Sequence, residues 1–235
     1  MKNCGVPVAF IEQISDRSFS APYCDMILLE VVARRYAVGS FLDRFPHLKP
    51  KKGEPPFRFD RPLIEFFLKT TQGVILNRER KRIGVLPDDT REVTRRKPVD
   101  DPLIFDPQDL NWKLYHPKIP TGERDSDLNF SVRRSDILPE HITAQTIFET
   151  TTKVFMLLEE AWKRLGCRLV DFKIEYGIDT EGNLLIADVI DNDAWRLRTQ
   201  NWEELSKQRF RDGENMETIG ELYQYVAELS RRLKL

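Results

Sequence analysis

The sequence predicts an α+β fold in which a largely antiparallel sheet is backed by long amphipathic helices. Residues 169–190 contain two short stretches of alternating character joined by turn residues, which is typical of a β-hairpin. Residues 139–165 and 215–234 carry apolar side chains at spacings of three and four, which is typical of amphipathic helices. Closely spaced strands followed by long helices favour separate layers over a parallel doubly wound sheet.

The first part of the chain contributes three further predicted strands. Residues 6–11, 26–33 and 63–69 are rich in β-branched and aliphatic side chains. Pro62 at the start of the third stretch weakens its strand character, because proline cannot donate to a sheet ladder.

Residues 77–100 differ from these stretches in composition. They hold eight Arg or Lys and five Asp or Glu, with few large apolar side chains. Such a stretch does not form a packed core of its own, so we predict a solvated, mobile surface loop. Residues 106–135 are also polar and rich in turn-forming residues.

The long helix predicted at 139–165 has recognisable ends. Pro139 suits a first helical turn, and Gly166 suits the position just after the last turn. Its apolar stripe predicts a core face that carries no chemistry in itself.

Composition excludes several classes of protein. The 235 residues include 37 Lys or Arg and 38 Asp or Glu, and this balance argues against a nucleic-acid binder that uses the basic 77–97 segment. No apolar run reaches the roughly 18 residues of a membrane-spanning helix. Cys4, Cys24 and Cys167 are scattered, which predicts free thiols in the cytoplasm, and the three histidines are too far apart in sequence to suggest a metal site.

The predicted hairpin carries charge on one face. Asp171, Lys173 and Glu175 alternate with apolar residues, and a turn centred on Glu181 and Gly182 would place Glu175 directly opposite Asp188. Facing carboxylates repel each other, and Mg²⁺ bound together with phosphate oxygens would offset that repulsion. The alternative is a plain amphipathic hairpin whose charged face is solvated.

Three stretches of the chain carry recognisable motifs. Residues 28–40, LLEVVARRYAVGS, contain the pattern E-x-x-x-R-x-x-x-x-G-S, and residues 169–177, LVDFKIEYG, contain D-x-K-x-E-[FY]-G. Residues 187–197, ADVIDNDAWRL, form a third segment that ends in W-R-L. Together these stretches resemble the signatures of the SAICAR synthetases, the ligases of purine biosynthesis, and the third is similar to the animal-type version. The resemblance implies a SAICAR-synthetase-like α+β fold.

This resemblance also implies an activity. The enzyme would use ATP and Mg²⁺ to join L-aspartate to carboxyaminoimidazole ribonucleotide, giving SAICAR, ADP and phosphate in the cytoplasm. The expected partners are these small molecules, with neither nucleic acid nor membrane, and whether the chain forms a homo-oligomer stays open. The alternative function is a catalytically weakened ribonucleotide-binding or interaction protein derived from the family.

The same resemblance assigns residues to roles. Those implied for the ribonucleotide phosphate are Arg34, Ser40 and Arg196. Those implied for ATP are Lys173, Glu175 and Asp188, of which Glu175 and Asp188 would hold Mg²⁺.

Further roles follow from shorter matches. Lys69 resembles the family lysine near the reacting phosphate, and Asp101, in an Asp-Pro pair, resembles a residue that contacts substrate and metal; with Lys173 they form the expected catalytic set. Residues 70–100 separate Lys69 from Asp101, a longer interval than is usual in the family. Lys207 and Arg211 match a late K-x-x-x-R pattern near the aspartate side of the site.

The chain lacks two stretches with which the family opens, a glycine-rich G-K-T-K loop and a D-R-x-x-A segment. We therefore expect a truncated N-terminal lobe, a weakened grip on the ATP phosphates and poor ligase activity of this chain alone. The expected organisation is a remnant of that lobe with the start of the substrate domain (1–68), an insertion-rich, partly mobile connection (69–135), and a C-terminal substrate- and metal-binding part (136–235).

Overall fold

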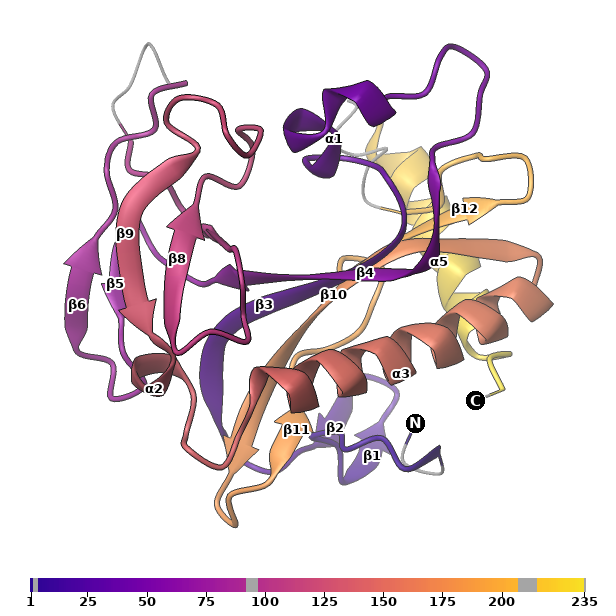
Figure 1. Ribbon diagram of the computed structural model, residues 1–235. Helices are drawn as coiled ribbons and strands as arrows, with labels where there is room; N and C mark the ends of the chain where they lie inside the picture. The colour runs from indigo at the N-terminus through magenta and orange to yellow at the C-terminus, as the bar shows by residue number, and fades with distance from the viewer. Residues whose placement is uncertain (2–3, 92–96, 207–214, 235) are drawn as a thin grey trace.

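The computed structural model describes residues 1, 4–91, 97–206 and 215–234 (Figure 1). Its central feature is an antiparallel eight-stranded sheet in the order β11-β10-β3-β4-β7-β8-β9, with β12 also paired to β10. The strands are β3 (Cys24–Tyr36), β4 (Arg58–Leu68), β7 (Leu103–Ile104), β8 (Asn111–Tyr115), β9 (Asp127–Arg133), β10 (Cys167–Asp179), β11 (Leu184–Ile186) and β12 (Trp195–Thr199). The predicted α+β class with a largely antiparallel sheet is confirmed.

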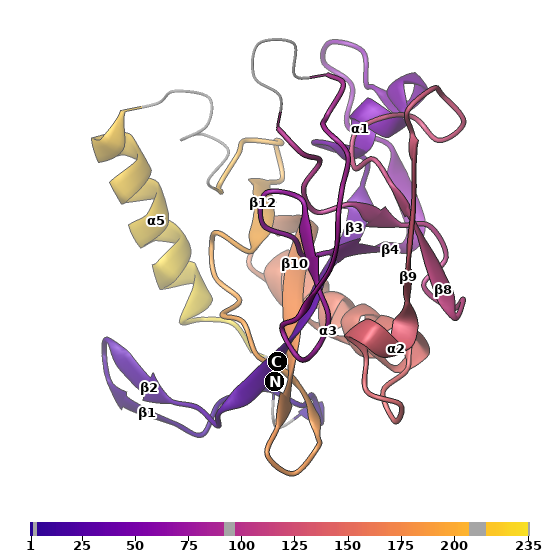
Figure 2. The same cartoon turned by 90° about the vertical axis from the view of Figure 1, so that its left-hand side faces the viewer.

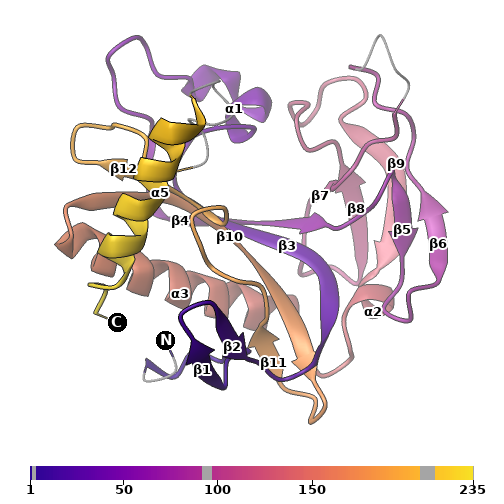
Figure 3. The same ribbon diagram turned by 180° about the vertical axis from the view of Figure 1, so that it is seen from behind.

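Two small hairpins and several helices complete the described chain. The hairpins are β1 (Glu12–Ser15) with β2 (Ser18–Ser20), and β5 (Val74–Leu76) with β6 (Arg82–Val85). The helices are α1 (Phe41–Arg44), the 3-10 turn η2 (Pro46–Leu48), α2 (Arg134–Ile137), α3 (Ala144–Arg164) and α5 (Met216–Ser230). Figures 1 and 3 show α3 and α5 on opposite sides of the sheet. No helix in the described part of the chain combines the length and apolar character needed to cross a membrane.

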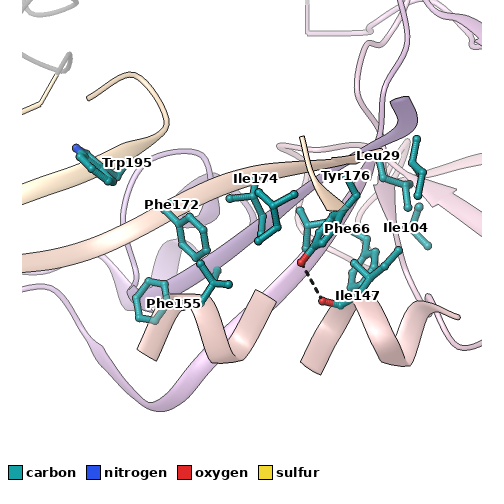
Figure 4. Close-up of a cluster of buried hydrophobic side chains, with 14 of the residues drawn as sticks. Leu29, Phe66, Ile104, Ile147, Phe155, Phe172, Ile174, Tyr176 and Trp195 are labelled. Atoms are coloured by element: carbon teal, nitrogen blue, oxygen red, sulfur yellow. Dashed lines mark hydrogen bonds between the residues drawn. The ribbon is translucent and has the colours of Figure 1, made fainter. Parts of the chain in front are cut away.

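Helix α3 forms the core with one face of the sheet. The Thr143 side chain accepts the backbone N–H of Thr146 at 3.0 Å and so begins the helix. Ile147 and Phe155 on α3 meet Phe172 and Tyr176 of β10 (Figure 4). Because side chains alternate along a strand, β10 must then turn its charged residues to the opposite face.

Tyr176 is a polar group inside this core. Its hydroxyl lies 2.8 Å from Oγ1 of Thr151, and it donates to the carbonyl oxygen of Ile147 at 3.4 Å (Figure 4). Burial raises the pKa of Tyr176 well above its ordinary value, although the hydrogen bond with Thr151 opposes that shift. The phenol therefore stays neutral and links α3 to β10.

The predicted strand at 6–11 is wrong. Val8 makes only an isolated bridge to Ile186, and the first strand begins at Glu12. The strand predicted at 63–69 is longer than expected and includes Pro62. Proline is tolerated there because the register of β3 and β4 shifts between Arg34 and Tyr36, so no ladder bond is needed from Pro62.

The loop predicted at 77–100 is mostly exposed and irregular, as expected, but part of it is a strand, and residues 92–96 lie outside the described residues. Residues 82–85 form β6, and Leu86 and Val99 are buried. Gly84 makes this packing feasible, because a Cβ at that position would lie 2.2 Å from Cζ of Phe130 on β9. Figures 1 and 3 show β5, β6, β8 and β9 together at one end of the molecule, and Figure 2 shows β8 and β9 well away from the β1–β2 hairpin. The division of the chain into three parts stays a prediction.

The 169–190 hairpin exists, but its register differs from the predicted one. Tyr176 pairs with Ile186, and the N–H of Ala187 donates to the carbonyl of Glu175 at 3.0 Å, so Glu175 does not face Asp188. The turn is centred on Glu181, because the N–H of Asp179 donates to the carbonyl of Asn183 at 3.1 Å. The Asp179 carboxylate accepts the N–H groups of Glu181 and Asn183, and Gly182 adopts φ +86°. A shift of one residue turns a side chain to the other face of a strand.

Candidate functional site

The candidate site lies on the sheet face that α3 does not cover. Strands β3, β4 and β10 run side by side there, and each of them places charged side chains on this face. In register, Asp171 stands beside Arg34, and Glu175 stands beside Glu30. One pair is of opposite charge and the other is of like charge, so the two ends of this face differ electrostatically.

Arg34 is held by two carboxylates. Its Nε donates to Oε2 of Glu65 at 2.6 Å, and its Nη1 donates to Oδ2 of Asp171 at 2.6 Å. Burial opposes the charge, yet Glu65 and Asp171 together raise the pKa of Arg34. Glu30 does not pair with Arg34, because residues four apart on an extended strand lie roughly 13 Å from each other.

Arg196 approaches the same carboxylate from β12. Its Nη1 donates to Oδ2 of Asp171 at 2.6 Å, and its guanidinium lies over Gly39. A cavity of about 210 Å³ opens beside these groups, and Arg34, Ser40, Lys173 and Arg196 line it. The structure thus brings together the three residues assigned to the ribonucleotide phosphate and one assigned to catalysis.

Lysines neutralise the like-charge pair. Nζ of Lys173 donates to Glu30 at 2.9 Å and to Glu175 at 3.2 Å, and Nζ of Lys69 donates to the other oxygen of Glu175 at 2.5 Å. Burial opposes the charge of Lys173, but its hydrogen bonds to Glu30 and Glu175 raise its pKa. The like-charge repulsion that was expected between Glu175 and Asp188 within the hairpin therefore arises between Glu175 on β10 and Glu30 on β3.

Asp101 lies beside Lys69 and Thr70 despite the long interval in sequence. Its Oδ1 accepts the N–H of Thr70 at 2.9 Å, and its own N–H donates to Oγ1 of Thr70 at 3.0 Å. Burial, together with the nearby charges of Glu30 and Asp100, raises the pKa of Asp101. Its φ of +47° is unusual for a residue with a side chain.

Asp188 stands apart from this charged face. It is exposed, and it lines a cavity of about 700 Å³ whose other walls are largely apolar. Val8, Phe10, Phe19 and Ile186 are among those walls. Such a cavity suits a flat apolar group with a polar group at its edge.

The described residues contain no cluster of three or more His, Cys, Asp or Glu that could hold a metal. The two carboxylates named for Mg²⁺, Glu175 and Asp188, form no such cluster, but Mg²⁺ bound with a nucleotide needs only one or two protein carboxylates. Lys207 and Arg211 lie outside the described residues.

Sequence reasoning gave no role to three buried charges near the cavity. Glu65, Asp171 and Arg44 are each less than 10% exposed, and each is bonded to a neighbouring charge. The sequence could have indicated Glu65, because it lies four residues before Lys69 in the predicted strand 63–69. Residues i and i+4 of a strand share a face, so Glu65 is expected on the same face as Lys69.

Known proteins resemble the chain along most of its length. The family model for SAICAR synthetase matches residues 1–93 and 108–228. A phosphoribosylaminoimidazole-succinocarboxamide synthase from Chloroflexus aurantiacus is 31% identical over 99% of this chain and 74% of its own length. A bifunctional purine synthesis protein from Dictyostelium discoideum is 31% identical over 87% of this chain, which spans only 16% of that protein.

Solved structures share the fold. A SAICAR synthetase in complex with ADP has a TM-score of 0.61 at 24% identity, covering 97% of this chain and 73% of that one. The SAICAR synthetase from Pyrococcus horikoshii OT3 also has a TM-score of 0.61, at 23% identity, covering 100% and 77%.

Proposed function

Because the chain belongs to the SAICAR synthetase family, we propose that it is an ATP-dependent ligase of purine biosynthesis. It joins L-aspartate to carboxyaminoimidazole ribonucleotide and gives SAICAR, ADP and phosphate. The observation that carries this proposal is the cavity in which Arg34, Ser40, Lys173 and Arg196 meet.

The ribonucleotide phosphate occupies that cavity in our proposal. Arginine binds phosphate oxygens through paired N–H groups, and a serine hydroxyl adds a further donor. Arg34 and Arg196 share Asp171, which holds both guanidiniums before the substrate arrives. Two cations fixed in advance lose little side-chain entropy on binding.

The reacting carboxylate lies toward Lys173 and Lys69. ATP transfers its γ-phosphoryl group to this carboxylate, forming an acyl phosphate and ADP. The amino nitrogen of aspartate then attacks the acyl carbon, phosphate leaves, and the nitrogen loses a proton. Negative charge spreads over the transferred phosphoryl oxygens, so the fixed ammonium groups of Lys69 and Lys173 stabilise the transition state. Asp101 lies beside Lys69 and is the third residue of the proposed catalytic set.

Nucleotide binding involves the second cavity. The adenine base fits the apolar walls near Phe10 and Phe19, with Asp188 at the edge. Glu175 and Asp188 would hold Mg²⁺ together with the ATP phosphates, which suits the preference of this ion for oxygen ligands. When bound, Mg²⁺ would offset the negative charge of the phosphates. Nζ of Lys69 donates to Oε2 of Glu175, so the carboxylate that would hold the ion also orients this ammonium group.

The alternative, a ribonucleotide-binding protein without turnover, is not favoured, because relatives of this chain are named as synthases. Lys207 and Arg211 are proposed for the aspartate side on their motif match alone. The three free cysteines suit action in the cytoplasm.

An omission experiment tests the proposed function. ADP release is measured with ATP and Mg²⁺ while aspartate or the carboxylated ribonucleotide is left out in turn. We expect release only when both are present, and a large loss of rate in Lys173→Met. ADP release that does not depend on aspartate would contradict the proposal.

A further inference from the structure

Next to the cavity, Glu65 and Arg44 are buried charged residues to which no role has yet been assigned. Glu65 on β4 has both of its carboxylate oxygens occupied, Oε2 by Nε of Arg34 and Oε1 by Nη2 of Arg44. Glu65 is 8% exposed and Arg44 is 2% exposed, so neither is presented to a ligand from the surface. The carboxylate therefore acts on its two neighbours and not on solvent.

Arg44 connects Glu65 to two other segments. It ends α1, the short helix that starts directly after Ser40, and its Nη1 donates to the carbonyl of Pro117 at 2.8 Å. Its guanidinium also lies over the rings of Phe41 and Phe67. Movement of Arg44 would thus shift both the segment that carries Ser40 and the carboxylate that holds Arg34.

We propose that Glu65, fixed by Arg44, is the positioning residue of the ribonucleotide phosphate site. This inference rests on the proposed function. Glu65 holds the Nε edge of Arg34 and Asp171 holds Nη1, so the orientation of the planar guanidinium is set from two sides.

The charges of the network support this role. Arg34, Arg44 and Arg196 carry three positive charges against the two negative charges of Glu65 and Asp171, which leaves one net positive charge for an incoming phosphate. Burial, and also the charge of Arg34, lower the pKa of Arg44, while Glu65 opposes that shift. Without the charge of Glu65, two buried guanidiniums would repel each other and Arg34 would leave its place.

The substitution Glu65→Gln tests this role with little change of shape. Its amide NH₂ would face one of the two guanidiniums, so a donor would meet a donor. The measurement is calorimetric affinity for the carboxylated ribonucleotide and, separately, for the nucleoside that lacks the phosphate. We expect the ribonucleotide affinity to fall about tenfold or more, and the nucleoside affinity to stay within about twofold of the unsubstituted chain, since the nucleoside does not use the phosphate contacts.

The chain offers a matched control. Arg35, the neighbour of Arg34, points to the other face and is bound by both oxygens of Glu159, with two contacts of 2.6 Å. Glu159→Gln disrupts a comparable Arg–Glu pair on α3 that has no link to the cavity. It should lower the stability of the fold without changing the discrimination between ribonucleotide and nucleoside.

The outcomes distinguish a failure of the proposed phosphate site from a failure of the proposed role of Glu65. If the unsubstituted chain binds the ribonucleotide no better than the nucleoside, both the phosphate site and the role of Glu65 are overturned. If it discriminates and Glu65→Gln discriminates equally well, only the role of Glu65 is overturned. Equal loss of affinity for both ligands would show a merely structural role. Should Glu65→Gln not fold, Arg44→Lys tests the same connection, and undiminished discrimination there would refute it.

Discussion

Gly39 lies at φ +60°, and no side chain separates its Cα from the guanidinium of Arg196. A Cβ at this position would lie 2.8 Å from Nη2 and 2.9 Å from Nη1 of Arg196. Both the backbone conformation and the close approach therefore require glycine. The Gly-Ser pair of the sequence signature has a physical reason here, because the glycine admits Arg196 to the cavity that Ser40 also lines.

We predict that Gly39→Ala displaces Arg196 and weakens ribonucleotide binding about tenfold or more. The left-handed conformation should also cost about 1–2 kcal/mol of stability. Gly166→Ala is the control, because Gly166 has φ +75° with no atom within 4 Å of an added Cβ. Calorimetry and urea unfolding would check both variants. Equal binding by Gly39→Ala and the control would rule out the steric argument.

Asp101 combines a raised pKa with a strained backbone. The folded pKa exceeds the unfolded one, so the carboxylate contributes least to stability when it is charged. The protonated carboxyl group of Asp101 makes its full contribution to folding stability below the ordinary carboxyl pKa of 3.8. This contribution is lost as the pH rises through the pKa of the folded state.

Asp101→Asn should therefore raise the melting temperature slightly near pH 7, by about 1 °C or less because Asp101 is exposed and solvent screens its charge, while ligase activity falls. The amide oxygen can still accept the N–H of Thr70, and asparagine tolerates positive φ well. The difference should disappear below about pH 3.8. Thermal unfolding followed across this pH range is the measurement. If the variant is less stable than the unsubstituted chain at pH 7, folding does not disfavour the charged form of Asp101.

At the scale of strands and helices, β3 and β10 show how charge is organised on a sheet. The sequence predicted which residues of 169–176 share a face, because alternation is a local property. It did not predict that Glu175 stands beside Glu30, because the pairing of distant strands is set by the whole sheet. The predicted partner, Asp188, was wrong because the turn is centred on Glu181, which places Ala187 opposite Glu175.

We predict that Lys173→Met destabilises the sheet by about 1–2 kcal/mol, because Glu30 and Glu175 then face each other with one cation fewer. Adding Glu30→Gln should recover part of this loss, since the second substitution removes the repulsion. Urea unfolding of the two single variants and the double variant measures the coupling, expected to be about 0.5 kcal/mol or more. Strictly additive effects would mean that the two carboxylates do not interact.

Elements with strong local patterns were predicted well, and those fixed by distant contacts were not. The helices near 139–165 and 215–234 were found as α3 and α5, and the strand at 26–33 as part of β3. The helix start predicted at Pro139 was wrong, because Thr143 caps the helix and α3 begins at Ala144. The strands between residues 74 and 133 were missed because most of them are only two to five residues long and lie in stretches rich in polar and turn-forming residues. They are stabilised by tertiary contacts, such as the approach of β6 to Phe130.

At the scale of the whole molecule, the two faces of the sheet have different roles. One face packs against α3 and forms the core (Figures 1 and 4), and the other carries the charged candidate site. Strand β7 pairs with β4 where Phe67 meets Leu103, and this pairing brings Asp101 next to Lys69 and Thr70. The described residues of the long interval, 70–91 and 97–100, therefore do not separate the parts of the site. Composition predicted none of this arrangement, whereas the family resemblance named most of the residues involved.

The central claim is that this chain forms an amide bond between aspartate and the carboxylated ribonucleotide. Incubation with ¹⁵N-aspartate, ATP, Mg²⁺ and that ribonucleotide, followed by mass spectrometry, tests it most directly. The account predicts a succinocarboxamide ribonucleotide that contains one ¹⁵N atom, formed in equal amount to ADP. Absence of labelled product, with the protein folded and all substrates present, would contradict the account.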